Sequence, residues 1–212
     1  MRLFLLEISL VTLALVTAAC SKKSANERNF KAAVQEYLDR APECVVASLP
    51  TDVLDWNGLH RPNSQLELLV KIGLVKRTAG MLHYHDDMAF FGDPNKQAPG
   101  LHYEISEQGK KYLPRKGQHP GFSLGNMQYF CYGTKEVVDI VRYTEPAPAA
   151  LVGATASKVD FTWKLKDVAE WAKDKDVQTA LYTARELAAE TTPQPGEVGL
   201  VLSNDGWHVP SM

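Results

Sequence analysis

The sequence predicts an α+β fold, with helices in the N-terminal half and an antiparallel sheet with one helix in the C-terminal half. Three observations favour this class. Apolar residues recur at helical spacing between positions 30 and 38, they alternate with polar residues between 159 and 166, and an Asp-Gly turn separates two short apolar runs near the end. With 212 residues, 45% apolar and 23% charged, the composition is that of a globular protein.

The first 20 residues have the order of a secretory signal. Arg2 is followed by a short apolar run, and three small residues precede Cys20. Glu7 interrupts the run, which is shorter than the roughly 20 apolar residues that a membrane span needs. We therefore predict that residues 1–19 are a signal peptide that is removed.

The tripeptide Ala18-Ala19-Cys20 resembles the lipobox of bacterial lipoprotein signal peptides, in which small residues precede an invariant cysteine. The resemblance implies that Cys20 becomes the first residue of the mature chain and carries a lipid anchor with fatty acids such as palmitate. Ser21, the next residue, implies sorting to the outer membrane of a Gram-negative cell. The expected location is the bacterial envelope, on the side that faces the periplasm.

The chain contains three cysteines, so a lipid on Cys20 leaves Cys44 and Cys131 as a pair. Disulfides persist outside the cytoplasm, and we predict that these two residues are bonded. The alternative is two buried thiols too far apart to bridge. Neither residue lies in a Cys-x-x-Cys motif, which argues against a redox enzyme.

The elements expected after the signal are, in order, a helix, a strand, two helices, a hairpin and a short helix. Ser24 and Glu27 form a capping-box pattern before the first helix, and an apolar segment from 44 to 49 suits a buried strand. A short helical piece is expected over residues 51–56. Asn63 is the expected cap of the next helix, which Gly73 ends.

The hairpin is expected around Leu82–Tyr84 and Leu101–Ile105, with a loop at Gly80 before it. The strings Leu68–Arg77 and Tyr103–Leu113 resemble a winged-helix domain, in which a helix runs into a Gly-Leu-Val-Lys strand and a wing follows. This resemblance covers about residues 25–115 and implies a winged-helix-like lobe over residues 24–116.

A Pro- and Gly-containing connection over residues 114–126 is expected to lead to a second lobe, residues 124–212. Two strands are predicted on either side of Gly133-Thr134, a turn over residues 145–150, and a half-buried strand over residues 159–166. Asp167 is the expected cap of one helix, which ends between Thr191 and Gly196. A hairpin around Ser203–Gly206 completes the lobe. The Cys44–Cys131 bond is expected to tie this lobe to the first one and to fix their orientation.

A winged-helix lobe suggests DNA binding, but the residues and the location argue against it. Phosphate contacts need several Lys or Arg residues on the recognition helix, where Gln65, Glu67, Leu68 and Lys71 are the non-core positions. An exported protein is also outside the cytoplasm. We expect no nucleic-acid partner.

The most metal-like stretch is His83-Tyr84-His85-Asp86-Asp87. Positions 83 and 85 project to the same side of a strand, and imidazole and carboxylate suit Zn²⁺. His102 is expected on the opposing strand. His83, His85 and Asp86 are therefore the candidate metal ligands, although the same residues at a hairpin end are commonly only solvated.

Adjacent aromatic residues at Phe90 and Phe91 lie between acidic and glycine residues and are candidates for contact with a partner. The chain has no P-loop and no His-Glu-x-x-His motif. No catalytic residue and no cofactor is predicted.

We expect a non-enzymatic envelope lipoprotein, held at the membrane by its lipid, that binds an envelope protein or polymer. One alternative is a metal-dependent envelope hydrolase built on His83, His85 and Asp86. A second alternative is an inhibitor of a hydrolase.

Overall fold

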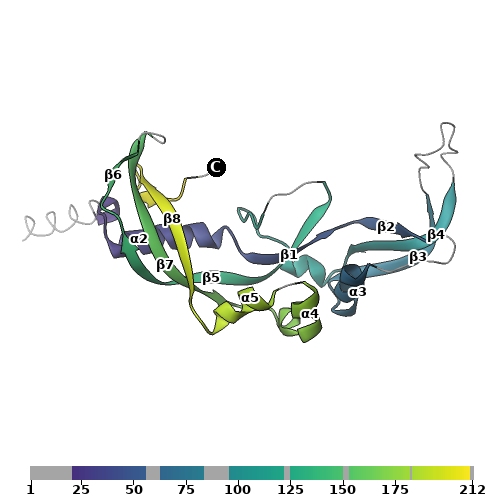
Figure 1. Ribbon diagram of the computed structural model, residues 1–212. Helices are drawn as coiled ribbons and strands as arrows, with labels where there is room; N and C mark the ends of the chain where they lie inside the picture. Colours follow the sequence, from purple (N-terminus) through teal and green to yellow (C-terminus); the bar gives the residue numbers. More distant parts are fainter. Residues whose placement is uncertain are drawn as a thin grey trace, which may run out of the picture. The chain divides into compact units, whose positions relative to one another are not determined.

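The computed structural model describes residues 21–55, 63–83, 96–121, 125–149, 153–181 and 183–210 (Figure 1). The chain forms two units, and each is discontinuous in sequence. The first consists of Met1–Arg40, Lys135–Lys166 and Ala189–Met212, and the second of Ala41–Thr134 and Asp167–Ala188. The expected lobes, 24–116 and 124–212, do not coincide with these units.

The α+β class with antiparallel strands is confirmed. The pairings β1–β5, β2–β4, β3–β4, β6–β7, β7–β8 and β8–β9 are all antiparallel. Among the described residues, no helix has the length and apolar character needed to cross a bilayer.

The first unit packs one long helix against antiparallel strands. Its helices and strands are η1 (Ser21–Lys23), α2 (Glu27–Asp39), the later part of β5 (Met127–Tyr143), β6 (Ala147–Ala149), β7 (Ala154–Lys166), β8 (Gln194–Leu202) and β9 (Trp207–His208). The strand order is β5–β7–β8–β9, with β6 beside the start of β7. Figure 1 shows α2 running alongside β5, β7 and β8.

The core of this unit lies between α2 and the strands. Phe30, Val34 and Leu38 recur at helical spacing and are buried, as the sequence predicts, and their partners include Val159 and Leu200. The helix begins at Asn26, whose side chain accepts a hydrogen bond from the backbone N–H of Asn29. The expectation of a capping box from Ser24 is therefore wrong, because Asn26 takes the cap position.

The predicted terminal hairpin is confirmed. Val201 pairs with His208 and Leu202 with Trp207, and the backbone N–H of Ser203 donates to the carbonyl of Gly206 at 2.9 Å. Gly206 has a φ of +133°, which glycine adopts more easily than other residues. The turn places Trp207 edge-on against Phe30, with ring centroids 5.0 Å apart.

The second unit contains two groups of strands and several short helices. Its elements are β1 (Glu43–Ser48), β2 (Thr51–Leu54), α3 (Ser64–Lys71), β3 (Val75–His83), β4 (Gln97–Ile105), η2 (Gly109–Tyr112), the first part of β5, η3 (Glu170–Lys173), α4 (Lys175–Ala180) and α5 (Ala184–Leu187). β1 pairs with β5 from Met127 to Gly133, and the order β2–β4–β3 forms a separate three-stranded sheet.

Helix α3 and the β3–β4 hairpin follow one another as the sequence predicts. Asn63 caps α3 by accepting from the backbone N–H groups of Gln65 and Leu66, and Gly73 follows the helix with a φ of +80°. Tyr103 on β4 is fully buried and donates its hydroxyl to Glu67 Oε1 at 2.5 Å. Arg77 on β3 binds the other oxygen of the same carboxylate at 2.6 Å.

The winged-helix-like lobe is not confirmed. The helix–strand–strand part of the pattern is present, but α2, the expected first helix of the lobe, belongs to the first unit and packs there on Val159 and Leu200. A sequence pattern of one buried face does not say which partner covers that face. Residues 24–116 are therefore divided between the two units.

Several local expectations are also wrong. Residues 51–54 form a strand instead of a short helix, β3 continues through Gly80, and β5 passes Gly133 without a break. The single helix expected after Asp167 is replaced by η3, α4, α5 and the short η4 (Ala188–Glu190). Asp167 has a φ of +53°, and the cap of α4 is Asp174.

Candidate functional site

Several residues singled out from the sequence lie outside the described part of the chain. These are Cys20, His85, Asp86, Phe90 and Phe91. Their roles as lipid attachment site, metal ligands and partner contacts therefore stay predictions.

The Cys44–Cys131 disulfide is present, with an S–S distance of 2.11 Å. The two residues are direct partners in the β1–β5 register. Both belong to the second unit, so the bond ties two strands of that unit together. The expectation that it joins two lobes is wrong, because β5 supplies strand partners to β1 as well as to β7.

His83 and His102 lie on opposite faces of the β2–β4–β3 sheet. His83 is opposite Gln97, and His102 is opposite Thr78, so the two histidines are five positions apart along the hairpin. An odd separation places side chains on different faces. His102 thus lies on the strand that pairs with that of His83, as expected, but on the other face of the sheet.

Each histidine has a neighbour of its own. His83 Nε2 lies 3.0 Å from Gln97 Nε2, and His102 Nδ1 lies 2.6 Å from Asp52 Oδ1. Within the described ranges, no three His, Cys, Asp or Glu side chains gather as metal ligands would.

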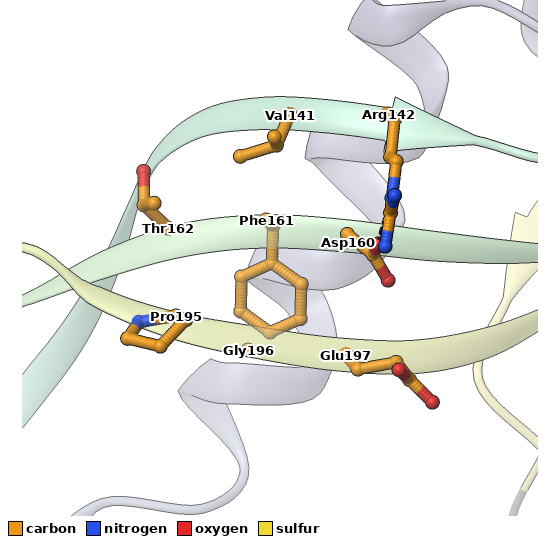
Figure 2. A pocket seen from close by; sticks show the side chains of 8 residues that line it. All are labelled: Val141, Arg142, Asp160, Phe161, Thr162, Pro195, Gly196 and Glu197. Atoms are coloured by element: carbon orange, nitrogen blue, oxygen red, sulfur yellow. Dashed lines mark hydrogen bonds and ion pairs between the residues drawn. The ribbon is translucent and has the colours of Figure 1, made fainter.

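A groove on the strands of the first unit is the candidate binding site (Figure 2). Its volume is about 480 Å³, and it is open on one side. Neighbouring positions of β5, β7 and β8 supply its lining, which consists of Val141, Arg142, Asp160, Phe161, Thr162, Pro195, Gly196 and Glu197.

The floor of this groove depends on a glycine. Figure 2 shows the ring of Phe161 lying across β8 at Gly196, its direct partner in the β7–β8 register. A β-carbon at position 196 would come within 2.5 Å of the ring carbon Cζ. Gly196 therefore leaves room for the ring, which is 4% exposed and packs with the core, and the neighbouring Val141 is 62% exposed.

The rim of the groove is charged. Arg142 and Asp160 extend toward each other in Figure 2, and Arg142 Nε donates to Asp160 Oδ2. This hydrogen bond and the negative charge of Asp160 raise the pKa of Arg142. The second oxygen, Oδ1, is buried and meets no hydrogen-bond donor in the part of the chain that the structure describes.

Each of the two carboxylates at the rim pairs with a basic side chain. Asp160 and Glu197 are opposite each other in the β7–β8 register, but Arg142 binds the first and Lys158 binds the second at 2.7 Å. No Ser, Cys or His is among the described residues that line the groove. The groove thus offers a ligand an apolar lining with charged groups at its rim.

This groove does not follow from the sequence pattern. The alternation over residues 159–166 predicts its central strand, but the same pattern predicts that the segment from Thr191 to Gly196 ends a helix. In the structure Gln194–Leu202 is a strand, and Pro195 and Gly196 are part of it. A glycine within a strand pattern that faces an aromatic residue was the available signal.

No family model, no curated protein and no solved structure matches this chain.

Proposed function

We propose that this chain is an exported bacterial lipoprotein, anchored by lipid at Cys20, that binds an envelope protein or polymer without catalysing a reaction. The groove at Phe161 and Gly196 is its binding surface. The signal-like residues 1–19 and the lipobox-like Ala18-Ala19-Cys20 support export and lipid anchoring.

The observation that carries the binding role is the apolar lining of the groove with Asp160 beside it. Val141, which is exposed, and Pro195 offer apolar contact at the groove, while the Phe161 ring is 4% exposed and packs with Val159 and Leu200 in the core. Among the described residues, no donor bonds the buried Asp160 Oδ1, and leaving a buried acceptor unpaired costs roughly 1–3 kcal/mol. A ligand that places an apolar group against this lining and a hydrogen-bond donor near Asp160 fits both features.

Site-specific crosslinking in native membranes tests this function. A photoreactive amino acid replaces Val141 in the groove or Asp139, an exposed position on the same strand. We expect one discrete envelope component to be captured from position 141 and not from position 139. Equal capture from both positions, or none from position 141, contradicts the proposed groove.

Two glycines of β8 provide a matched pair for the same experiment. Gly196→Ala pushes the Phe161 ring out of its place, whereas a β-carbon at Gly199 meets no atom within 4 Å. We expect the capture from position 141 to fall about tenfold in Gly196→Ala, which corresponds to roughly 1.4 kcal/mol, and to persist in Gly199→Ala. Urea unfolding of both variants verifies that each is folded under the conditions used.

A further inference from the structure

The outer edge of β1 in the second unit pairs with no further strand among the described residues. β1 pairs with β5 on one side and is the last strand of its sheet among the described residues. Gln65 Nε2 donates to the carbonyl oxygen of Val46 at 2.9 Å, so this carbonyl faces away from β5. Because peptide groups alternate in direction along an antiparallel strand, Cys44 and Ser48 face the same way.

Two hollows lie along this edge, and Gln65 lines both. The first, of about 340 Å³, is bounded by Cys44–Val46 on one side and by Ala180, Leu181 and Thr183 on the other. The second, of about 310 Å³, continues along Val46–Ser48 toward Asn63 and Leu66. Together they form a groove beside the peptide groups that face away from β5, which we call the β1 groove.

The first hollow is acidic. Glu43 and Glu186 line it, and the described residues that line both hollows include no Lys, Arg or His. Tyr132, which is 2% exposed, lines the same hollow, and burial, followed by the charges of Glu43 and Glu186, raises its pKa. A cationic group of a ligand in this hollow would therefore be attracted by two carboxylates.

A buried hydroxyl gives a second, independent sign of a ligand. Thr183 is 3% exposed and lines the first hollow, and its Oγ1 has no hydrogen-bond partner in the described part of the chain. Buried hydroxyls are normally paired. This hollow thus combines negative charge with an unused hydrogen-bonding group.

We propose that the β1 groove binds an extended peptide segment that adds to β1 as a strand and places a Lys or Arg side chain between Glu43 and Glu186. Addition of a strand at a sheet edge takes its affinity from main-chain hydrogen bonds and its specificity from pockets for alternate side chains. The Gln65 amide occupies one of these main-chain positions in the free protein, and the incoming strand displaces it. This site is separate from the groove at Phe161.

A proline substitution at Val46 tests the main-chain part of the proposal. Val46→Pro removes an N–H that faces away from β5, and proline is tolerated at such edge positions. Val46→Thr is the control, because it keeps the N–H. The probe is fluorescent acetyl-Thr-Val-Arg-Val-Thr-amide, and anisotropy with the purified full chain measures its binding.

We expect the arginine peptide to bind the wild-type chain and Val46→Thr, and to lose binding to Val46→Pro. A peptide with Glu in place of Arg should bind about tenfold more weakly. Binding that is unchanged in Val46→Pro, or that is equal for the two peptides, overturns the proposal. So does an absence of binding to the wild-type chain.

Two further measurements guard against a variant that fails to fold. Hydrogen exchange on the wild-type chain should show slower exchange at the Val46 and Ser48 amides when the arginine peptide is present, and protection confined to other strands contradicts the proposal. Glu186→Gln should weaken binding of the arginine peptide. Glu170→Gln should leave this binding unchanged, because the Glu170 side chain is 88% exposed and pairs with Lys173. Neither result depends on the crosslinks from position 141.

Discussion

Gly109 shows how a single residue without a side chain holds the second unit together. A β-carbon at this position would overlap the carbonyl oxygen of Leu74 and lie 3.1 Å from the Phe130 ring. The backbone N–H of Gly109 also donates to Ser106 Oγ, which in turn donates to the carbonyl of Gly73. The segment after β4 is thus fixed against the end of α3.

Replacing Gly109 with alanine should destabilise the protein by about 1–3 kcal/mol, the usual cost of overpacking a closed site. Gly80→Ala is the control in the same unit, because a β-carbon there meets no atom within 4 Å. Urea unfolding midpoints of the two variants measure the difference. Equal midpoints would show that the Leu74 contact does not restrain position 109.

Tyr103 couples the stability of the protein to alkaline pH. Burial and the bond to Glu67 raise the pKa of Tyr103 to about 12, from an ordinary value near 10. The folded state therefore favours the protonated hydroxyl, and this stabilisation is complete below about pH 10 and is lost as the pH rises toward 12.

We expect the free energy of unfolding to fall over this range in the wild-type chain and to fall less steeply in Tyr103→Phe. Tyr37→Phe, at a position that is 40% exposed, serves as the control. Parallel pH profiles for wild type and Tyr103→Phe would contradict this account of the Tyr103–Glu67 contact.

At the scale of elements, the disulfide is the main covalent tie of the second unit. Cys44 and Cys131 are separated by 87 positions, and a loop of that length corresponds to about 4–5 kcal/mol in the chain-entropy model. The free energy of unfolding of the double variant Cys44→Ala/Cys131→Ala, measured by urea titration, should be lower by an amount of this order. A count of free thiols in the denatured, non-reduced protein should give none from these two residues, and two reactive thiols would refute the bond.

Elements were predictable from the sequence where the signal is local. Asn63 and Gly73 bound α3 as expected, and the Ser203–Gly206 turn joins β8 to β9, because caps and tight turns depend on a few adjacent residues. The helix expected after Asp167 was wrong for the opposite reason. Its apolar residues recur at helical spacing, but in the structure they are distributed over several short helices. Trp171 on one of these helices packs against Tyr132 of β5.

The candidate site was beyond the reach of local patterns. Val141, Phe161 and Gly196 come from three strands, and only their pairing brings them together. The faces of His83 and His102 likewise depend on the register of the hairpin. A one-residue change in register exchanges the two faces of a strand, so a motif alone does not place these side chains.

At the scale of the whole molecule, each of the two units is built from segments that are separated along the chain. Residues 24–116, expected to be an independent lobe, lack Val159 and Leu200, which cover the apolar face of α2, and lack Phe130, beside Gly109. A fragment of residues 24–116 should therefore not unfold cooperatively, as measured by circular dichroism during urea titration. A sharp transition in this fragment would contradict the division into two units and would favour the winged-helix-like lobe.

Export of the protein and its lipid attachment at Cys20 form the claim on which the proposed function depends most. Intact mass spectrometry of the chain purified from native membranes tests it directly. We expect residues 1–19 to be absent and Cys20 to carry the mass of a lipid anchor, and we expect Cys20→Ser to prevent this modification. A membrane-purified chain that retains residues 1–19, or that begins elsewhere with an unmodified Cys20, would contradict the assignment as a lipoprotein.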